Sequence, residues 1–124
     1  MIDALYQQYA AAKPEHRLGV VQEQLHTSMK WCVAHPVNDL ASPEAVHTEF
    51  LAPLLQALPD VERRPQIRMQ GGYEGRHWIN STGYFVGTFE KALLGIPATG
   101  KVLYLRYTEM VCIEQGQILS LIHI

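Results

Sequence analysis

Cysteine, charged residues and long apolar runs are all scarce in this chain of 124 residues. Its two cysteines, Cys32 and Cys112, lie far apart and outside any CxxC or Cys/His spacing, so neither a disulfide framework nor a zinc site is expected. No apolar run exceeds four residues, whereas a membrane helix needs about 20, and Asp3 stands where a secretory signal is positively charged. The sequence therefore predicts a cytoplasmic protein that makes no membrane contact.

An excess of charge of one sign is also missing. The 10 Lys and Arg residues nearly balance the 12 Asp and Glu residues, which leaves a net charge of −2. A surface without net positive charge does not attract nucleic-acid phosphates, so we expect no nucleic-acid partner. Hydrophobic residues make up 48% of the chain, which is enough for the core of one globular domain over 1–124.

The first half of the chain has the hydrophobic spacing of helices. Pro14 separates two stretches in which apolar residues recur every three to four positions. Ser42 is a favourable N-cap for a third helix, which Pro53 should kink because proline lacks an N–H group. We therefore expect helices over 2–13, 14–29 and 42–58, and a short strand over 31–34.

From residue 61 onward the hydrophobic period changes to two, which is typical of strands. Glycines at 71, 72 and 75 and the pair Gln115–Gly116 favour tight turns. The expected strands cover 67–70, 76–89, 101–114 and the residues from 117 onward, with a loop over 90–100. Helices followed by antiparallel strands predict an α+β fold in which the helices pack on one face of a curved sheet.

One carboxylate interrupts an apolar strand face. The odd positions of the expected strand 101–114 are apolar except for Glu109, which places this carboxylate where burial is expected. A buried carboxylate with a pKa near neutrality suits a general acid or base. The alternative is a structural salt bridge to Arg68 or Arg76 on a neighbouring strand, and the sequence does not decide between the two.

Further candidates for ligand contact lie on the same two strands. Leu105 and Tyr107 share the strand face of Glu109. Trp78, Asn80 and Tyr84 share one face of the preceding strand, where polar groups between aromatic rings can orient a ring-bearing ligand. Ordinary sheet packing is the alternative for these three residues.

The remaining charged groups indicate no cofactor chemistry. The six histidines form no HxH or HExxH pattern, and no P-loop, dinucleotide fingerprint or nucleophile elbow occurs, so we expect neither a metal nor an organic cofactor. Arg106 is expected at a subunit contact. The cluster Arg63, Arg64 and Arg68 is too small for a nucleic-acid footprint and is interpreted as a solvated sheet edge.

Three stretches together suggest a family. The end of the third helix (54–60), the GYFVGTF segment (83–89) and the LGIPATG loop (94–100) resemble SnoaL-like polyketide cyclases, also called ester cyclases, of the nuclear transport factor 2-like superfamily. The similarity covers about residues 31–118. It implies a cone-shaped α+β barrel, with a pocket at the wide end and a homodimer formed through the sheet. It also places Ile96 at the lip of the pocket.

The resemblance also implies an activity. Characterised cyclases close a polyketide ester by an aldol reaction, without a cofactor, using an acid/base carboxylate. Glu109 falls where the cyclases have a pocket histidine, and His123 falls where they have the acid/base aspartate of the last strand. The relatives continue further, so the run 119–124 is interpreted as a truncated or altered ending.

Two functions are therefore expected from the sequence. The first is a cofactor-independent enzyme of lyase or isomerase type that acts on a small apolar carbonyl compound, with Glu109 and His123 as catalytic residues. Leu105, Tyr107, Ile96, Trp78, Asn80 and Tyr84 would bind its substrate. The second is a non-catalytic protein of the same fold, which binds a hydrophobic ligand or serves as a dimeric scaffold.

Overall fold

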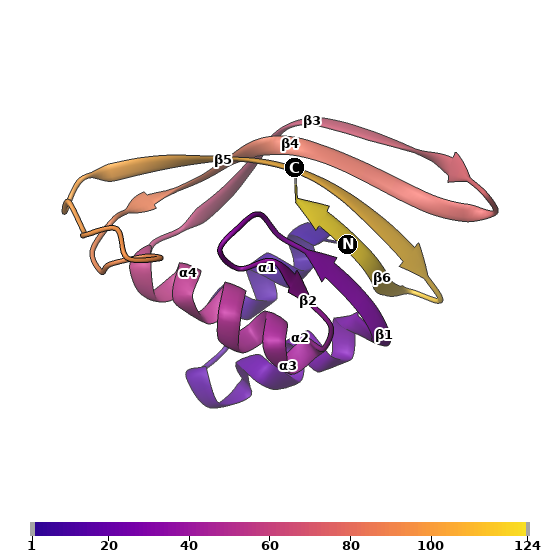
Figure 1. Cartoon of the computed structure of the whole chain (residues 1–124), viewed down its shortest axis with the longest axis horizontal. Coiled ribbons are helices and arrows are strands. Elements are labelled where there is room, and N and C mark those ends of the chain that lie inside the picture. Colours follow the sequence, from indigo (N-terminus) through magenta and orange to yellow (C-terminus); the bar gives the residue numbers. More distant parts are fainter. Residues whose placement is uncertain (1, 124) are drawn as a thin grey trace.

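A computed structural model describes residues 2–123 of the chain, so Ile124 of the interpreted ending lies outside the described residues. Helices fill most of the first half and long strands the second half, as expected for an α+β fold. The long strands arch over the helices and leave the cone open (Figure 1). No described helix has the length and hydropathy to cross a membrane.

The helices pack on the concave side of the sheet. Ser42 caps its helix as predicted, since its Oγ accepts a hydrogen bond from the Ala45 N–H at 3.1 Å. A π-helical turn lies just before Pro53, where the sequence predicted a kink. The helical elements are α1 (Ile2–Ala11), the 3-10 turn Pro14–His16, α2 (Arg17–Gln24), α3 (Pro43–Val46), the π-helical turn His47–Leu51 and α4 (Ala52–Ala57).

Six strands form one sheet in the order β2-β1-β6-β5-β4-β3. All neighbours are antiparallel except β1 and β6, which pair in parallel. The strands are β1 (Leu25–Cys32), β2 (Asp39–Leu40), β3 (Glu62–Tyr73), β4 (Arg76–Thr88), β5 (Val102–Glu114) and β6 (Gln117–His123).

The second expected helix was too long. Its residues from Leu25 onward belong to strand β1, and the short strand predicted over 31–34 is only the end of that strand. Leu25, Met29 and Trp31 are buried, and their spacing fits either a helix face or alternate positions of a strand. Pairing with β6 decides in favour of the strand, because Trp31 lies opposite Leu121 inside the core.

A β-bulge in the edge strand β3 fixes which arginines face inward. The register with β4 shifts between Pro65 and Ile67, so Arg63 lies opposite Phe85 while Arg68 lies opposite Ser81. Residues five apart in a regular strand point to opposite faces, but the extra residue of the bulge puts Arg63 and Arg68 on the same face. Gly83 allows this, because a Cβ there would lie 2.2 Å from the carbonyl oxygen of Arg64.

Candidate functional site

Glu109 lies on the concave face of β5, as the strand pattern predicted. The residue is 0% exposed, and its neighbours on that face, Tyr107 and Val111, are hydrophobic and buried. On the adjacent strand β4 it lies opposite Ser81, which is also buried. A carboxylate removed from water in this way must find hydrogen-bond donors or cations within the protein.

The first partner of Glu109 is an arginine that the sequence had placed in solvent. The Nη2 atom of Arg63 donates to the Glu109 carboxylate. The sequence predicted an arginine as the alternative partner of Glu109, but the arginine in this position is Arg63 and neither Arg68 nor Arg76. The Arg63 side chain is only 5% exposed, so the interpretation of this residue as part of a solvated edge was wrong. The bulge of β3 is the reason, because it turns Arg63 inward.

The Arg63 guanidinium is held from several sides. Its Nε atom donates to the Asp3 carboxylate of α1 at 2.8 Å, and its Cζ atom lies 4.7 Å from the ring centre of Tyr6 and 4.2 Å from that of Tyr107. Burial lowers the pKa of Arg63, but the charge of Glu109 and the hydrogen bonds that Arg63 donates to both carboxylates outweigh it and leave the pKa raised. The cation therefore stays charged in a mostly aromatic cage.

The second partner of Glu109 is His123. These two residues lie directly opposite each other in the pairing of β5 with β6. The imidazole Nε2–H donates to the Glu109 Oε2 across 3.2 Å. Two aromatic rings border the imidazole, with centroids 5.0 Å away for Phe50 and 6.0 Å away for Trp31. The predicted catalytic residues are thus brought together.

An apolar cavity of about 230 Å³ lies beside the imidazole. It opens between the loop after β1, the π-helical turn, α4 and the loop after β4, and strands β4, β5 and β6 form its other side. Three residues predicted from the sequence line it, namely Leu105, Tyr107 and His123, whereas Glu109 does not. The other lining residues are Val33, Ala34, His35, Val37, Glu49, Phe50, Pro53, Leu54, Phe85, Leu93, Leu94, Arg106 and Thr108.

Two tyrosine hydroxyls lie close to the buried charges. Tyr107 Oη shares a hydrogen bond with Ser81 Oγ at 3.1 Å, and burial is the main cause of its raised pKa. Burial also raises the pKa of Tyr6 well above its usual range, and the negative charge of Glu109 adds to this effect. Tyr6 Oη has no hydrogen-bond partner among residues 2–123. Both phenols therefore stay protonated near neutral pH.

Four expected ligand contacts lie elsewhere. Trp78, Asn80 and Tyr84 pair with Cys112, Met110 and Arg106 and point to the convex face, away from Glu109. The prediction that these three residues share a pocket with Glu109 is corrected. Ser81 lies opposite Glu109 on the concave face, and each of the three is an odd number of positions from Ser81, so its side chain is on the other face. Ile96 is 60% exposed in the loop after β4, and Leu93 and Leu94 line the cavity in its place.

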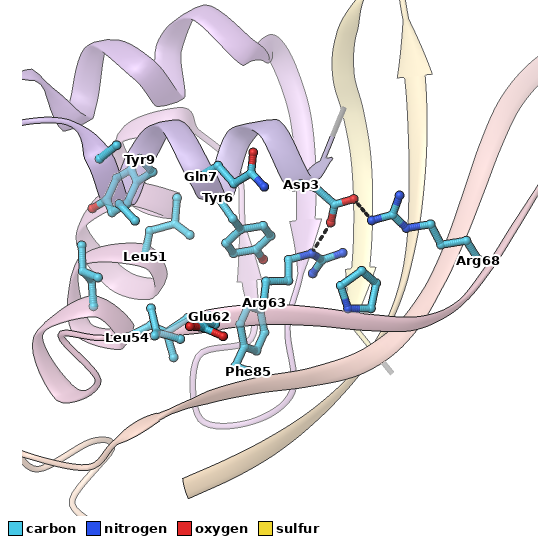
Figure 2. Close-up of a pocket in the computed structure, with 15 residues that line it drawn as sticks. Asp3, Tyr6, Gln7, Tyr9, Leu51, Leu54, Glu62, Arg63, Arg68 and Phe85 are labelled. Atoms are coloured by element: carbon cyan, nitrogen blue, oxygen red, sulfur yellow. Dashed lines mark hydrogen bonds and ion pairs between the residues drawn. The ribbon is translucent and has the colours of Figure 1, made fainter. Parts of the chain in front are cut away.

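A second and larger hollow runs between α1 and the edge strand β3. Its volume is about 900 Å³, and Leu54 and Phe85 border both this groove and the apolar cavity. Figure 2 shows Asp3 at one end of the groove, between Arg63 and Arg68. Among the described residues no group of three or more His, Cys, Asp and Glu side chains is arranged to hold a metal ion.

Sequence reasoning missed three members of the buried cluster. Asp3 and Tyr6 were assigned only to a helix, and Arg63 to a solvated edge. Their inward orientation depends on the bulge and on the docking of α1, neither of which has a local signal in the chain. The one available signal was the pair of arginines, Arg63 and Arg68, on a strand close to a predicted buried carboxylate.

Comparison with solved structures shows which fold this is. A candidate SnoaL-like polyketide cyclase from Jannaschia sp. CCS1 superposes with a TM-score of 0.74 at 15% identity, over 99% of this chain and 81% of that one. IdmH, a candidate polyketide cyclase from Streptomyces antibioticus, gives 0.76 at 17% identity, over 99% and 87%. A nuclear transport factor 2-like protein from Burkholderia thailandensis E264 gives 0.66 at 14% identity, over 98% and 88%.

No family model matches the chain, and no curated protein matches it. At these low identities the structural likeness establishes the fold and not the activity. The chain therefore has the cone-shaped nuclear transport factor 2-like fold that its sequence resemblance implied, with a curved sheet that does not close.

Proposed function

We propose that the protein catalyses cofactor-independent proton transfer on a small apolar carbonyl compound, with His123 and Glu109 as the catalytic pair. The observation that supports this most is their arrangement: an imidazole lines the apolar cavity, and its Nε2–H is hydrogen-bonded to a fully buried carboxylate. In such a pair the carboxylate orients the imidazole, which is a common general base in enzymes.

The two residues take different roles from those expected. Glu109 does not line the cavity and already accepts from Arg63, so it serves as the orienting partner. His123 lines the cavity and removes the proton of the substrate through its other ring nitrogen, Nδ1. The imidazolium that forms is stabilised by the adjacent carboxylate, because the surrounding apolar side chains screen little charge. In the cyclases that the chain resembles, the acid and the histidine occupy the reverse positions.

The cavity favours a small substrate. Its volume of about 230 Å³ lies below the range of roughly 300–1,000 Å³ that is usual for drug-sized ligands. Leu93, Leu105 and Phe50 provide apolar walls, and His35 and Glu49 also line the cavity. A compound with one ring or a short chain and an activated C–H group beside a carbonyl fits this description, and an aldol or isomerase reaction follows from its enolate.

Deuterium exchange tests this function without knowledge of the natural substrate. Ethyl 2-methylacetoacetate is a small β-keto ester whose C2 proton is acidified by two carbonyls. We expect the protein to accelerate uptake of deuterium from D₂O at C2, followed by NMR, and His123→Gln to reduce the acceleration about 10²-fold or more. His26→Gln is the matched control, because His26 is not among the residues lining the cavity. Equal rates for the two variants would remove His123 from the proposed role.

The ion pair favours a second candidate function. Glu109 is already paired with a buried arginine, which is also what a purely structural carboxylate shows. In that case the cavity binds a hydrophobic molecule without chemistry, or is a remnant of a scaffold. Native mass spectrometry distinguishes these cases: a retained apolar ligand combined with no deuterium exchange supports the binding function, and no ligand with no exchange supports a scaffold.

We also propose a homodimer formed through the convex face of the sheet. The supporting observation is a set of exposed apolar residues on this face, which no helix covers in Figure 1. Met69 and Tyr104 are each 61% exposed, and Ile67 is 57% exposed. A patch of this kind is typical of a subunit contact.

Cys32 and Cys112 are free thiols, which supports the expected cytoplasmic location.

A further inference from the structure

Arg63 connects three elements at a single buried point. It extends from the bulged edge of β3, donates to Asp3 on α1 and donates to Glu109 on β5. The rings of Tyr6 and Tyr107 lie against its guanidinium. Glu109 in turn accepts from His123. The four charged or ionisable groups thus form a continuous chain from α1 to the apolar cavity.

We propose that Arg63 is a positioning residue for the catalytic pair: its guanidinium keeps the Glu109 carboxylate charged and directed toward His123, and Asp3 fixes the guanidinium from α1. This inference rests on the proposed function for its catalytic consequence. The placement of the charges stands independently of any substrate.

The physical reason is the burial of Glu109. A carboxylate with 0% exposure loses nearly all of its hydration, so without a nearby cation it takes up a proton and stops accepting from an imidazole N–H. Arg63 supplies that cation through a fork-shaped group that donates to two acceptors in fixed directions. Its Nε and Nη2 atoms serve Asp3 and Glu109 respectively, so rotation of the guanidinium would break both bonds.

Asp3 completes the arrangement from the helix side. Its two carboxylate oxygens accept from Arg63 and from Arg68, whose guanidinium is partly exposed at the end of the groove (Figure 2). The bulge in β3 brings these two arginines to one face, so both can reach the same carboxylate. Loss of Asp3 would leave the Arg63 guanidinium with one anchor, and Glu109 with a less firmly held partner.

The first test measures the charge of Glu109 directly. The ¹³C signal of its side-chain carboxyl carbon, assigned with Glu109→Gln, reports whether the group is ionised at pH 7. We expect an ionised carboxylate in the wild type and in Arg63→Lys, and a protonated carboxyl in Arg63→Met. Arg64→Met is the control, because Arg64 is exposed and pairs with Glu62 at 2.8 Å.

The second test uses deuterium exchange into ethyl 2-methylacetoacetate. We expect Arg63→Met to lower kcat about 10²-fold with little change in KM, Arg63→Lys to restore at least a tenth of the rate, and Asp3→Asn to lower kcat about 3-fold to 10-fold. If Arg63→Met does not fold, the double variant Arg63→Met/Glu109→Gln removes the uncompensated charge and is expected to fold without exchange activity.

The outcomes separate the two proposals. An ionised Glu109 carboxylate in Arg63→Met, or exchange rates unchanged in that variant, would overturn the role of Arg63. Equal loss in Arg63→Lys and Arg63→Met would also contradict it, because a retained cation must rescue a positioning role. If the wild-type protein shows no exchange, the proposed function fails, and the ¹³C signal alone then decides whether Arg63 keeps Glu109 charged.

Discussion

At the scale of single residues, the protein concentrates its ionisable groups in an otherwise apolar interior. Glu109 is fully buried, and Arg63 nearly so, in contact with two tyrosine rings. Such a pair is costly to desolvate, and removal of one partner alone leaves an uncompensated charge. The strand pattern was sufficient to predict the burial of Glu109, because a single carboxylate interrupted an apolar face. It was insufficient to predict Arg63, whose orientation depends on a bulge.

Replacement of Tyr6 by phenylalanine tests the packing around this pair. Tyr6 Oη is buried and has no partner within the described chain, so its removal relieves the desolvation of a hydroxyl. We expect Tyr6→Phe to raise the free energy of unfolding by up to about 1 kcal/mol in urea denaturation. Tyr107→Phe is the control and should lower it by about 1 kcal/mol, because Tyr107 bonds to Ser81. A loss of stability in Tyr6→Phe would contradict this account.

The same tyrosines predict the alkaline limit of stability. Burial raises the pKa of Tyr6 and Tyr107, and it raises the pKa of Tyr9 to about 12. The unfolded chain releases these protons near pH 10, before the folded chain does, so ionisation stabilises the unfolded state. The stability from protonated tyrosines is fully present below about pH 10 and is lost as the pH rises toward 12. Denaturation midpoints between pH 8 and 11 should fall less steeply in Tyr6→Phe than in the wild type.

At the scale of elements, the strands that carry their own period-two pattern were predicted better than the elements whose bounds depend on pairing with another strand. The turns after β3 and β5 carry glycines, and the period-two pattern located β4 and β5 almost to the residue. The boundary between α2 and β1 was misplaced, because the spacing of Leu25 and Met29 fits both structures and only pairing with β6 decides. Strand β3 extends well beyond the predicted 67–70. Its pairing with β4 runs from Glu62 to Tyr73, and this pairing, not the hydrophobic pattern of β3 itself, sets its bounds.

The bulge of β3 gives a prediction at this scale. A Cβ at position 83 would lie 2.2 Å from the Arg64 carbonyl oxygen and 2.8 Å from Pro65 Cα, so Gly83→Ala must push β3 away from β4. We expect a loss of about 2 kcal/mol or more in thermal or urea unfolding. Gly71→Ala is the matched control in the same sheet, because nothing lies within 4 Å of its added Cβ. Similar stabilities for both variants would show that β3 does not pack on β4 in this register.

At the scale of the whole molecule, the fold separates two surfaces of the sheet. The concave side holds the helices, the buried charges and the cavity, and the convex side presents Trp78, Asn80 and Tyr84. The sequence grouped these three residues with the pocket because the strand pattern shows alternation but not which face the helices cover. The exposed apolar residues of the convex face are the observation on which the proposed dimer rests.

The proposed dimer is tested by a charge placed on the convex face. Tyr104→Glu introduces a carboxylate into the exposed apolar patch, and burial of that charge against a second copy would be unfavourable. We expect the wild type to elute as a dimer and Tyr104→Glu as a monomer in chromatography with light scattering. Lys13→Glu, an exposed position after α1, serves as the control and should remain dimeric. A monomeric wild type would rule out the proposed assembly.

A double-mutant cycle in the deuterium exchange assay tests the central claim most directly. If His123 removes the proton and Glu109 acts only through it, then Glu109→Gln lowers kcat for exchange in ethyl 2-methylacetoacetate, and adding the same change to His123→Gln lowers it no further. Independent losses that multiply in the double variant, or a fully active His123→Gln protein, would contradict the account.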